Sequence, residues 1–252
     1  MFGEILPNEA FGFILVTIRL SALVMLVPVF SESSIPTRIR VGFALAVSFI
    51  VYSTIKTQLP PIPASVFDLT NLMVHELIIG SMLGLSIRVL MSAIHTAGTV
   101  IAFQTGLAAA RAFDPSQGQQ SVVVAAFLNL VAITLILTTD LHHLMLQGMA
   151  FSFEKFPIGE QIPMADFATM VTQHVSGAFF LGFQMASPFI VYGMIFNLGL
   201  GLVARMVPGF QVFFVGMPIN IFLGFAMMSI VLGSLMTLFL GKFEALLLNM
   251  IG

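Results

Sequence analysis

The sequence predicts an all-α protein that is integral to, or associated with, a membrane and is built of helical hairpins. Of its 252 residues, 58% are hydrophobic and only 8% are charged. Soluble domains carry about 25% charged residues, so the surplus apolar surface has to face lipid or other apolar protein. The mean hydropathy is +1.07, and the apolar residues gather in about six helical segments, several with expected kinks at Pro or Gly.

The first two segments lie on either side of a polar break. Residues 11–30 are apolar and, at about 20 residues, long enough to cross a bilayer, although Arg19 lies within them. A shorter apolar run follows at residues 41–55. Residues 58–68 contain three prolines and are expected to form a stiff, extended connector.

The middle of the chain alternates between apolar runs and polar loops. Residues 69–110 are long and mostly apolar, and a turn-rich loop follows at residues 114–120. Residues 121–139 form an uninterrupted apolar span, whereas residues 140–166 are more polar and acidic. We therefore expect helices on both sides of the turn-rich loop.

Two runs without charged side chains, residues 175–204 and 206–241, complete the apolar segments. As a single helix the second run would be about 54 Å long, whereas the hydrocarbon core of a bilayer is about 30 Å thick. It therefore has to break or leave the membrane. The expected break points are Pro208, Gly209, Gly216 and Pro218.

Charge and cysteine content exclude several classes of function. The chain has no cysteine, which excludes disulfides and thiol chemistry, and its net charge of −2 includes no basic stripe of the kind that binds nucleic acid. Glu4 and Glu9 stand where a signal peptide has basic residues, so the first apolar run is expected to remain in the mature protein. With the N-terminus outside, five arginines fall inside and three lysines outside, which favours that orientation.

Enzyme motifs are incomplete. His75 and Glu76 begin like the zinc motif H-E-x-x-H, but the second histidine would be residue 79, which is Ile. The elbow G-x-S-x-G of serine hydrolases is also missing from the sequence. We therefore predict that the chain is not an enzyme and uses no cofactor or metal.

Ionisable groups inside the apolar segments are costly unless they are paired. We expect Glu76 to pair with an arginine of another helix, and we group Arg19, Glu76 and Arg88 as candidates for buried charge pairing. Alternatively, Arg19 lies where the chain leaves the lipid.

Two glycine pairs indicate close helix packing. Gly80 and Gly84 are four residues apart and so lie on one helix face. Gly199 and Gly201 match the loose dinucleotide pattern G-x-G-x-x-A, but no strand precedes them and no acidic residue follows about 20 positions on. We interpret them as a second place where helices approach each other.

Asp140, His142 and His143 cluster at the end of an apolar span. Their donor groups suit a metal or a proton-transfer site. The alternative is a helix end that leaves the apolar zone, where polar side chains cost little.

The block from Arg205 to Pro218, Arg-Met-Val-Pro-Gly-Phe-Gln-Val-Phe-Phe-Val-Gly-Met-Pro, resembles FliR, the flagellar export-apparatus family that is shared with type III secretion injectisomes. Three further stretches agree with it: residues 28–38, residues 106–115, and His143 with residues 156–159. The resemblance spans essentially the whole chain. It implies a single export-gate domain over residues 1–252, in which FliP-like and FliQ-like hairpins are fused.

The resemblance also implies a role and partners. FliR-like proteins assemble with FliP and FliQ into the pore-forming gate of the flagellar type III export system, with FlhB and FlhA nearby, and unfolded flagellar proteins pass through it. The expected location is the bacterial inner membrane, in the flagellar basal body. Membrane lipid is an expected contact, and nucleic acid is not. Neighbouring subunits can bury apolar helices in place of lipid, so the six segments need not all be membrane spans in the final assembly.

Two sets of site residues follow from the resemblance. The family's central loop, here residues 106–120, lies in the lumen and plugs the closed channel, with Leu107 and Phe113 obstructing it and Arg111 and Asp114 as tethers. The expected plug residues are Gly106, Leu107, Arg111, Phe113, Asp114 and Pro115. The expected subunit-interface residues are Arg205, Pro208, Gln211, Phe213, Phe214, Gly216 and Pro218.

Two other functions stay open from the sequence. The first is a homologous injectisome gate subunit, which differs from a flagellar one only in overall likeness. The second is a stand-alone secondary transporter, which needs convergent polar groups near the bilayer midplane and usually has inverted repeats. Glu76, Arg88 and His95 are candidates for those groups, but the sequence shows no such repeat.

Overall fold

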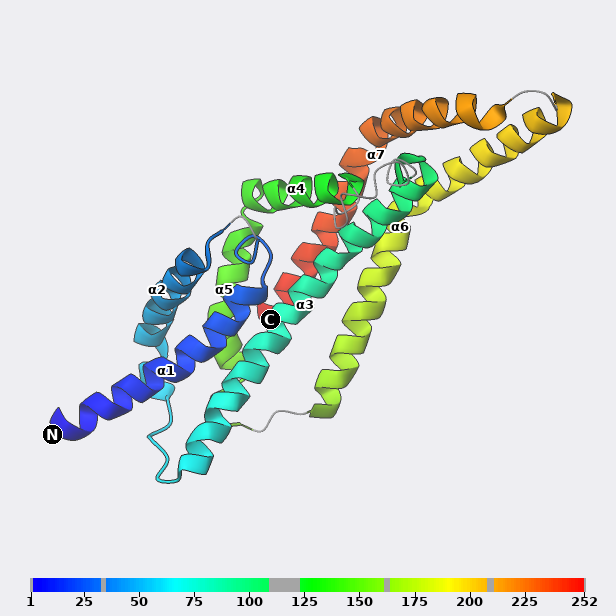
Figure 1. Cartoon of the computed structure of the whole chain (residues 1–252). Helices are drawn as coiled ribbons and strands as arrows, with labels where there is room; N and C mark the ends of the chain where they lie inside the picture. Colours follow the sequence, from blue (N-terminus) through cyan, green and yellow to red (C-terminus); the bar gives the residue numbers. More distant parts are fainter. Residues whose placement is uncertain (1, 33–34, 109–122, 161–163, 208–210, 252) are drawn as a thin grey trace. The chain divides into compact units, whose positions relative to one another are not determined.

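In the part of the chain that it describes, the computed structural model consists of helices and the segments that connect them (Figure 1). It describes residues 2–32, 35–108, 123–160, 164–207 and 211–251, without the side chains of residues 2–6, 164–166, 212 and 213. The helices in chain order are α1 (Phe2–Leu26), α2 (Thr37–Ile55), the 3-10 helix η1 (Lys56–Gln58), α3 (Val66–Gln104), α4 (Val123–Thr138), α5 (Leu141–Lys155), α6 (Met164–Met206) and α7 (Val212–Ile251).

The all-α prediction is confirmed, as is the number of apolar segments. Five of the described helices are long and apolar enough to cross a membrane, and α4 and α5 together make a sixth span if they are counted as one broken segment. The proline-rich connector is shorter than the predicted 58–68, because Gln58 ends η1 and α3 begins at Val66. Residues 59–65 between them are not helical.

The chain divides into two compact units. The first comprises Met1–Val89, Leu137–Val175 and Phe243–Gly252, and the second comprises Leu90–Ile136 and Ser176–Lys242. The long helices α3, α6 and α7 each contribute residues to both units. The expected fusion of FliP-like and FliQ-like hairpins into one domain stays a prediction.

In the first unit, α1 packs against α2 and α3. Aromatic pairs join α1 to α2 as antiparallel neighbours: Phe13 meets Tyr52 with ring centroids 5.8 Å apart, and the ring of Phe30, just after α1, stacks on Phe43 at 4.6 Å. Leu15, Leu20 and Leu23 of α1 are fully buried. α1 therefore contributes these leucines to the core of the first unit.

The contact between α1 and α3 depends on glycine. A Cβ atom at Gly80 would collide with the carbonyl oxygen of Arg19 and lie 3.0 Å from the Cβ of Ala22. A Cβ atom at Gly84 would lie 2.8 Å from the Cβ of Leu26. The predicted close packing at this glycine pair is confirmed, and it brings the two helix backbones together at the level of Arg19.

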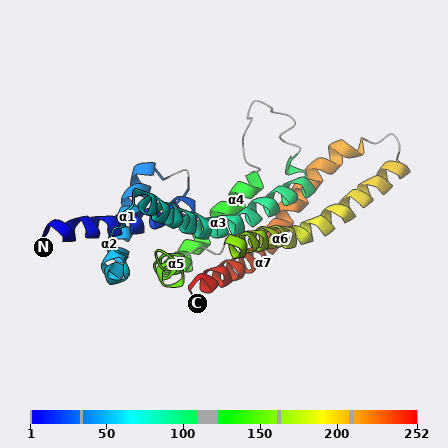
Figure 2. The same cartoon turned by 90° about the horizontal axis from the view of Figure 1, so that it is seen from below.

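In the second unit, α6 and α7 form a helical hairpin (Figure 2). Leu200 of α6 lies against Gly216 of α7, and further from the connection Tyr192 of α6 meets Asn220 of α7. The carboxyl-terminal part of α3 packs on the same hairpin, because a Cβ atom at Gly193 would collide with the side chain of Gln104 and one at Gly224 would lie 2.6 Å from the Cβ of Thr105.

Two of the predicted helix breaks are wrong. Gly216 and Pro218 lie inside α7, which is continuous from Val212 to Ile251. α6 ends at Met206 and α7 begins at Val212, and neither Val207 nor Gln211 is helical. Pro218 removes one backbone hydrogen bond from α7 without ending the helix. Pro208 and Gly209, the other expected break points, lie outside the described residues.

Candidate functional site

A buried ion pair connects three helices of the first unit. Nε of Arg19, on α1, donates to Oε2 of Glu76, on α3, at 2.5 Å, and Nη2 donates to Oε1 at 3.0 Å. Nη1 donates to the carbonyl oxygen of Ser152, on α5, at 2.9 Å. The guanidinium carbon lies 4.2 Å from the ring centroid of Phe153, and both charged side chains are fully buried.

This geometry neutralises two charges that would otherwise be stranded among apolar helices. The guanidinium and carboxylate form a bidentate pair, with two hydrogen bonds between them, which is the strongest form of this interaction. The bonds from one arginine reach α3 and α5 together, so Arg19 fixes the relative position of three helices. The sequence predicts an arginine of another helix as the partner of Glu76, and the structure places Arg19 there.

Arg88 does not join this group. It lies on α3 twelve residues after Glu76, and its side chain is exposed. Because a helix turns once in 3.6 residues, twelve residues place Arg88 about 120° around α3 from Glu76. The two side chains therefore leave the helix on different faces, and the prediction of a buried Arg88 is not met in the chain alone.

The incomplete zinc motif at His75 and Glu76 is part of this packing. Both carboxylate oxygens of Glu76 accept hydrogen bonds from Arg19. Ile79, which stands where the second histidine would be, is buried. Glu76 is therefore a structural partner of Arg19 here, and both of its carboxylate oxygens take part in the ion pair.

The start of the predicted plug loop lies in the second unit. α3 ends at Gln104, and Gly106 follows with φ of +76°, the left-handed conformation that commonly ends helices at glycine. Leu107 lines an apolar cavity of about 290 Å³ together with residues of α3, α4 and α7. The other four predicted plug residues, Arg111, Phe113, Asp114 and Pro115, lie outside the described residues.

Two polar side chains hold this helix end. Nδ2 of Asn220, on α7, donates to the carbonyl oxygen of Gln104 at 3.2 Å. The hydroxyl of Tyr192, on α6, donates to Oδ1 of the same asparagine at 2.7 Å and also lies 3.2 Å from its carbonyl oxygen. One asparagine therefore links the last residue of α3 to both helices of the hairpin.

The predicted interface residues separate into two groups. Arg205, Gln211, Phe214 and Pro218 are exposed, and Phe214 has 78% of its surface free. Gly216 is buried, and a Cβ atom there would lie 2.9 Å from the side chain of Leu200 in the same chain. Pro208 and the side chain of Phe213 lie outside the described residues.

Gly199 and Gly201 differ from Gly80 and Gly84. They lie within α6, and a Cβ atom at either position would meet nothing within 4 Å. Their helical context excludes the dinucleotide-binding turn, which needs a strand before it. The expected close helix contact is not formed inside the described chain, so this face of α6 is open.

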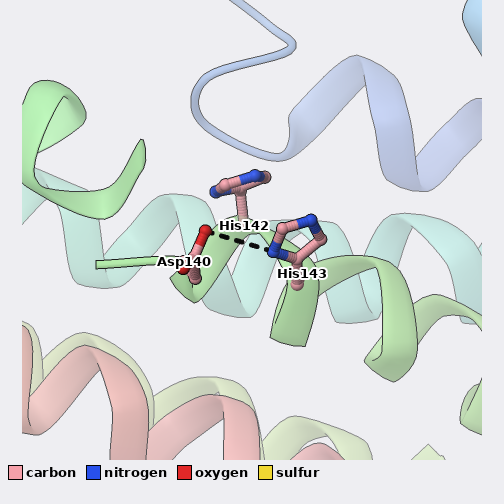
Figure 3. A group of neighbouring side chains, drawn as sticks. All are labelled: Asp140, His142 and His143. Carbon is pink, nitrogen blue, oxygen red and sulfur yellow. Dashed lines mark ion pairs between the residues drawn. The ribbon is translucent and has the colours of Figure 1, made fainter. Parts of the chain in front are cut away.

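Asp140, His142 and His143 lie at the start of α5 (Figure 3). Their candidate ligand atoms are within 4.8 Å of one another, and Nδ1 of His143 lies 3.4 Å from Oδ1 of Asp140. Asp140 and His143 are exposed, with 76% and 62% of their side-chain surfaces free. Asp140 has φ of +59° and marks the corner between α4 and α5, which fits the interpretation as a polar helix end.

Sequence reasoning missed Ser152, Tyr192 and Asn220. Ser152 takes part through its backbone carbonyl, which no sequence pattern reveals. The other two carry a detectable signal, because tyrosine occurs only twice in the chain and Asn220 interrupts a long uncharged apolar run. Polar groups in such runs tend to be hydrogen-bonded partners between helices.

Long apolar helices, exposed apolar faces and a buried ion pair define a helical membrane protein. Comparison with known proteins identifies the family. The sequence model described as "Bacterial export proteins, family 1" matches residues 10–246. The chain therefore belongs to this family of bacterial export proteins.

Similar proteins carry the name expected from the 205–218 block. The chain is 37% identical to the flagellar biosynthetic protein FliR of Caulobacter vibrioides, over 92% of this chain and 93% of the relative. It is 33% identical to FliR of Bacillus subtilis, over 87% and 85%, and 29% identical to FliR of Escherichia coli K12, over 84% and 80%. The predicted resemblance to the FliR family is confirmed.

Proposed function

We propose that this chain is a subunit of the flagellar type III protein-export gate in the bacterial inner membrane, within the flagellar basal body. It forms a channel with FliP and FliQ, close to FlhB and FlhA, and unfolded flagellar proteins pass through that channel. Its central loop, residues 106–120, plugs the closed pore. In this proposal the chain has no enzymatic activity.

The length of the apolar helices is the observation that carries this proposal. α3, α6 and α7 have 39, 43 and 40 residues. At 1.5 Å per residue each is about 60 Å long, about twice the thickness of the hydrocarbon core of a bilayer. A helix that spans lipid and stops at its surface needs only half of this length.

The exposed apolar side chains follow these helices beyond one bilayer thickness. On α6 they extend from Val175 to Met206, about 46 Å along the axis, and on α7 from Phe214 to Leu248, about 51 Å. Only 17% and 22% of the residues in the most apolar stretches of α6 and α7 are buried within the chain. Since lipid covers about 30 Å, other protein chains have to cover the rest, as in a multi-subunit gate.

The open glycines of α6 support protein partners over lipid. Gly199 and Gly201 leave space beside the helix, and their neighbours Leu198 and Leu202 are exposed. Small residues of this kind allow another helix to approach closely. Within the export family, FliP and FliQ are the partners that we propose for this surface.

An injectisome gate subunit is the second candidate. The similar proteins compared above are all named as flagellar biosynthetic proteins, which favours the flagellar role. A stand-alone transporter is disfavoured because its polar groups do not converge. Glu76 is buried in an ion pair with Arg19, whereas Arg88 is exposed on another face of α3.

Shortening the loop at residues 106–120 tests the plug. We expect vesicles that contain the complex with FliP and FliQ to release trapped potassium ions faster when the loop is shortened, or when it is replaced by a Gly/Ser sequence of equal length. The matched control places a Gly/Ser sequence in the connector at residues 59–63, which precedes α3, and should leave the vesicles sealed. Unchanged sealing after both loop changes would rule out the plug.

A further inference from the structure

The carboxyl end of α3 is held by an asparagine of another helix. The last carbonyl groups of a helix have no donors within that helix, and the carbonyl of Gln104 receives its donor from Asn220 of α7. The next residues are Thr105, which is buried, and Gly106. The residue that bonds Asn220 is thus two positions before the start of the central loop.

Tyr192 determines which way the asparagine amide points. An amide has one accepting oxygen and one donating nitrogen. Because the tyrosine hydroxyl donates to Oδ1, the nitrogen Nδ2 is turned toward Gln104. Removing the hydroxyl would leave the amide free to turn its oxygen toward the carbonyl of Gln104, where it could not bond.

Glycines surround this bond and make it possible. At Gly106 a Cβ atom would lie 3.2 Å from Nδ2 of Asn220, and the positive φ independently favours glycine. Gly193 and Gly224 give space to Gln104 and Thr105 on the two helices of the hairpin. Residues 104–106 are therefore held from α6 and from α7 within the second unit.

We propose that Asn220, oriented by Tyr192, is a positioning residue that fixes the start of the central loop. This inference rests on the proposed plug function: the hydrogen bond to the α6–α7 hairpin holds residues 104–106, from which the central loop continues. A movement between α6 and α7 that separates Tyr192 from Asn220 releases Gln104 and loosens the loop at Gly106.

The first test measures the loop start directly. The chain contains no cysteine, so a nitroxide attached at Leu107→Cys in the full-length chain reports this position alone. We expect Asn220→Asp and, more weakly, Tyr192→Phe to increase the mobility of the label. A label at Leu198→Cys, which is exposed on α6, should not respond. Asn197→Asp, the same change at an exposed asparagine lining the cavity beside Gly106, should leave the label at residue 107 unchanged.

The second test measures the seal. In vesicles containing the complex with FliP and FliQ, Asn220→Asp should raise potassium leakage by about 2- to 10-fold, the shift expected from losing one net hydrogen bond. Unchanged mobility at residue 107, or an equal response to Asn197→Asp, would overturn the positioning role.

If shortening the loop causes no leakage while the label responds as expected, the plug fails and the hydrogen-bonded anchor stands. If the loop change leaks and the Asn220 variant does not, only the positioning role fails.

Discussion

Arg19 and Glu76 lie 57 residues apart in the chain and meet through two hydrogen bonds, of 2.5 Å and 3.0 Å, with no solvent exposure on either side chain. Glu76 lies one turn before Gly80 on α3, and a Cβ atom at Gly80 would collide with the carbonyl oxygen of Arg19. The ion pair and the glycine contact therefore both hold α1 against α3 in the same region.

Removing one member of this pair should destabilise the protein strongly. Arg19→Met or Glu76→Leu leaves an uncompensated buried charge, for which we expect a loss of about 3–5 kcal/mol. The double variant Arg19→Met/Glu76→Leu removes both charges and should recover most of that loss. Thermal unfolding of the purified protein in detergent measures all three. Additive losses in the double variant would show that the two side chains do not act as a pair.

Arg88 should behave differently from Arg19. Its side chain is exposed on another face of α3, and surface substitutions usually change stability by less than about 0.5 kcal/mol. We expect Arg88→Gln to leave the unfolding temperature of the isolated chain unchanged. A loss as large as that of Arg19→Met would place Arg88 in the buried charge group after all.

Gly80 should not tolerate a side chain. A Cβ atom there would collide with the carbonyl oxygen of Arg19, so Gly80→Ala is expected to cost about 1–3 kcal/mol through overpacking. Gly42 provides the matched control, because it lies in α2 with nothing within 4 Å of a Cβ atom. Gly42→Ala should stabilise the helix by about 0.5–1 kcal/mol. Equal effects of the two changes, measured by thermal unfolding, would refute the close contact of α1 and α3.

Phe214 should matter for assembly and not for the fold of the chain. It is 78% exposed within the block that resembles the family most specifically. Phe214→Asp should reduce co-purification with FliP and FliQ at least tenfold, about 1.4 kcal/mol, because a charge would be placed against apolar protein. Phe214→Leu should retain the partners. Undiminished recovery of both partners with the aspartate variant would argue against an interface at this residue.

Gly216 should act through its own chain. A side chain there would press on Leu200 across the α6–α7 hairpin. We expect Gly216→Leu to lower the stability of the isolated chain by about 1–3 kcal/mol, an effect that Phe214→Asp lacks. If Gly216→Leu unfolds at the temperature of the unmodified chain, Gly216 does not pack the hairpin.

Composition predicts much of this fold. In an apolar environment the backbone N–H and C=O groups of a segment have to bond each other, and a helix achieves this, so each long apolar run is expected to be helical. The need for a partner at Glu76 is predictable because an unpaired charge among apolar helices is costly. Which arginine of another helix supplies it is not predictable, because only tertiary packing brings Arg19 of α1 to Glu76 of α3. Gly80 and Gly84 are predictable from their spacing on one face.

Other features are decided by packing that no local pattern contains. Gly and Pro often end helices, yet α7 continues through Gly216 and Pro218, and Gly216 lies against Leu200 of α6. Asn220 and Tyr192 are 28 residues apart, and only the reversal between α6 and α7 brings them to Gln104. The spacing of Gly199 and Gly201 predicts a close helix contact, but no other part of the described chain lies within 4 Å of a Cβ atom at either glycine.

The composition of the native particle tests the proposal of a shared channel wall most directly. The chain, carrying an affinity tag, is purified from bacterial membranes in a mild detergent, and native mass spectrometry determines which subunits accompany it. Our account predicts a stable particle that contains FliP and FliQ together with this chain. A chain recovered alone, as a monomer that keeps its fold and binds neither partner, would contradict it.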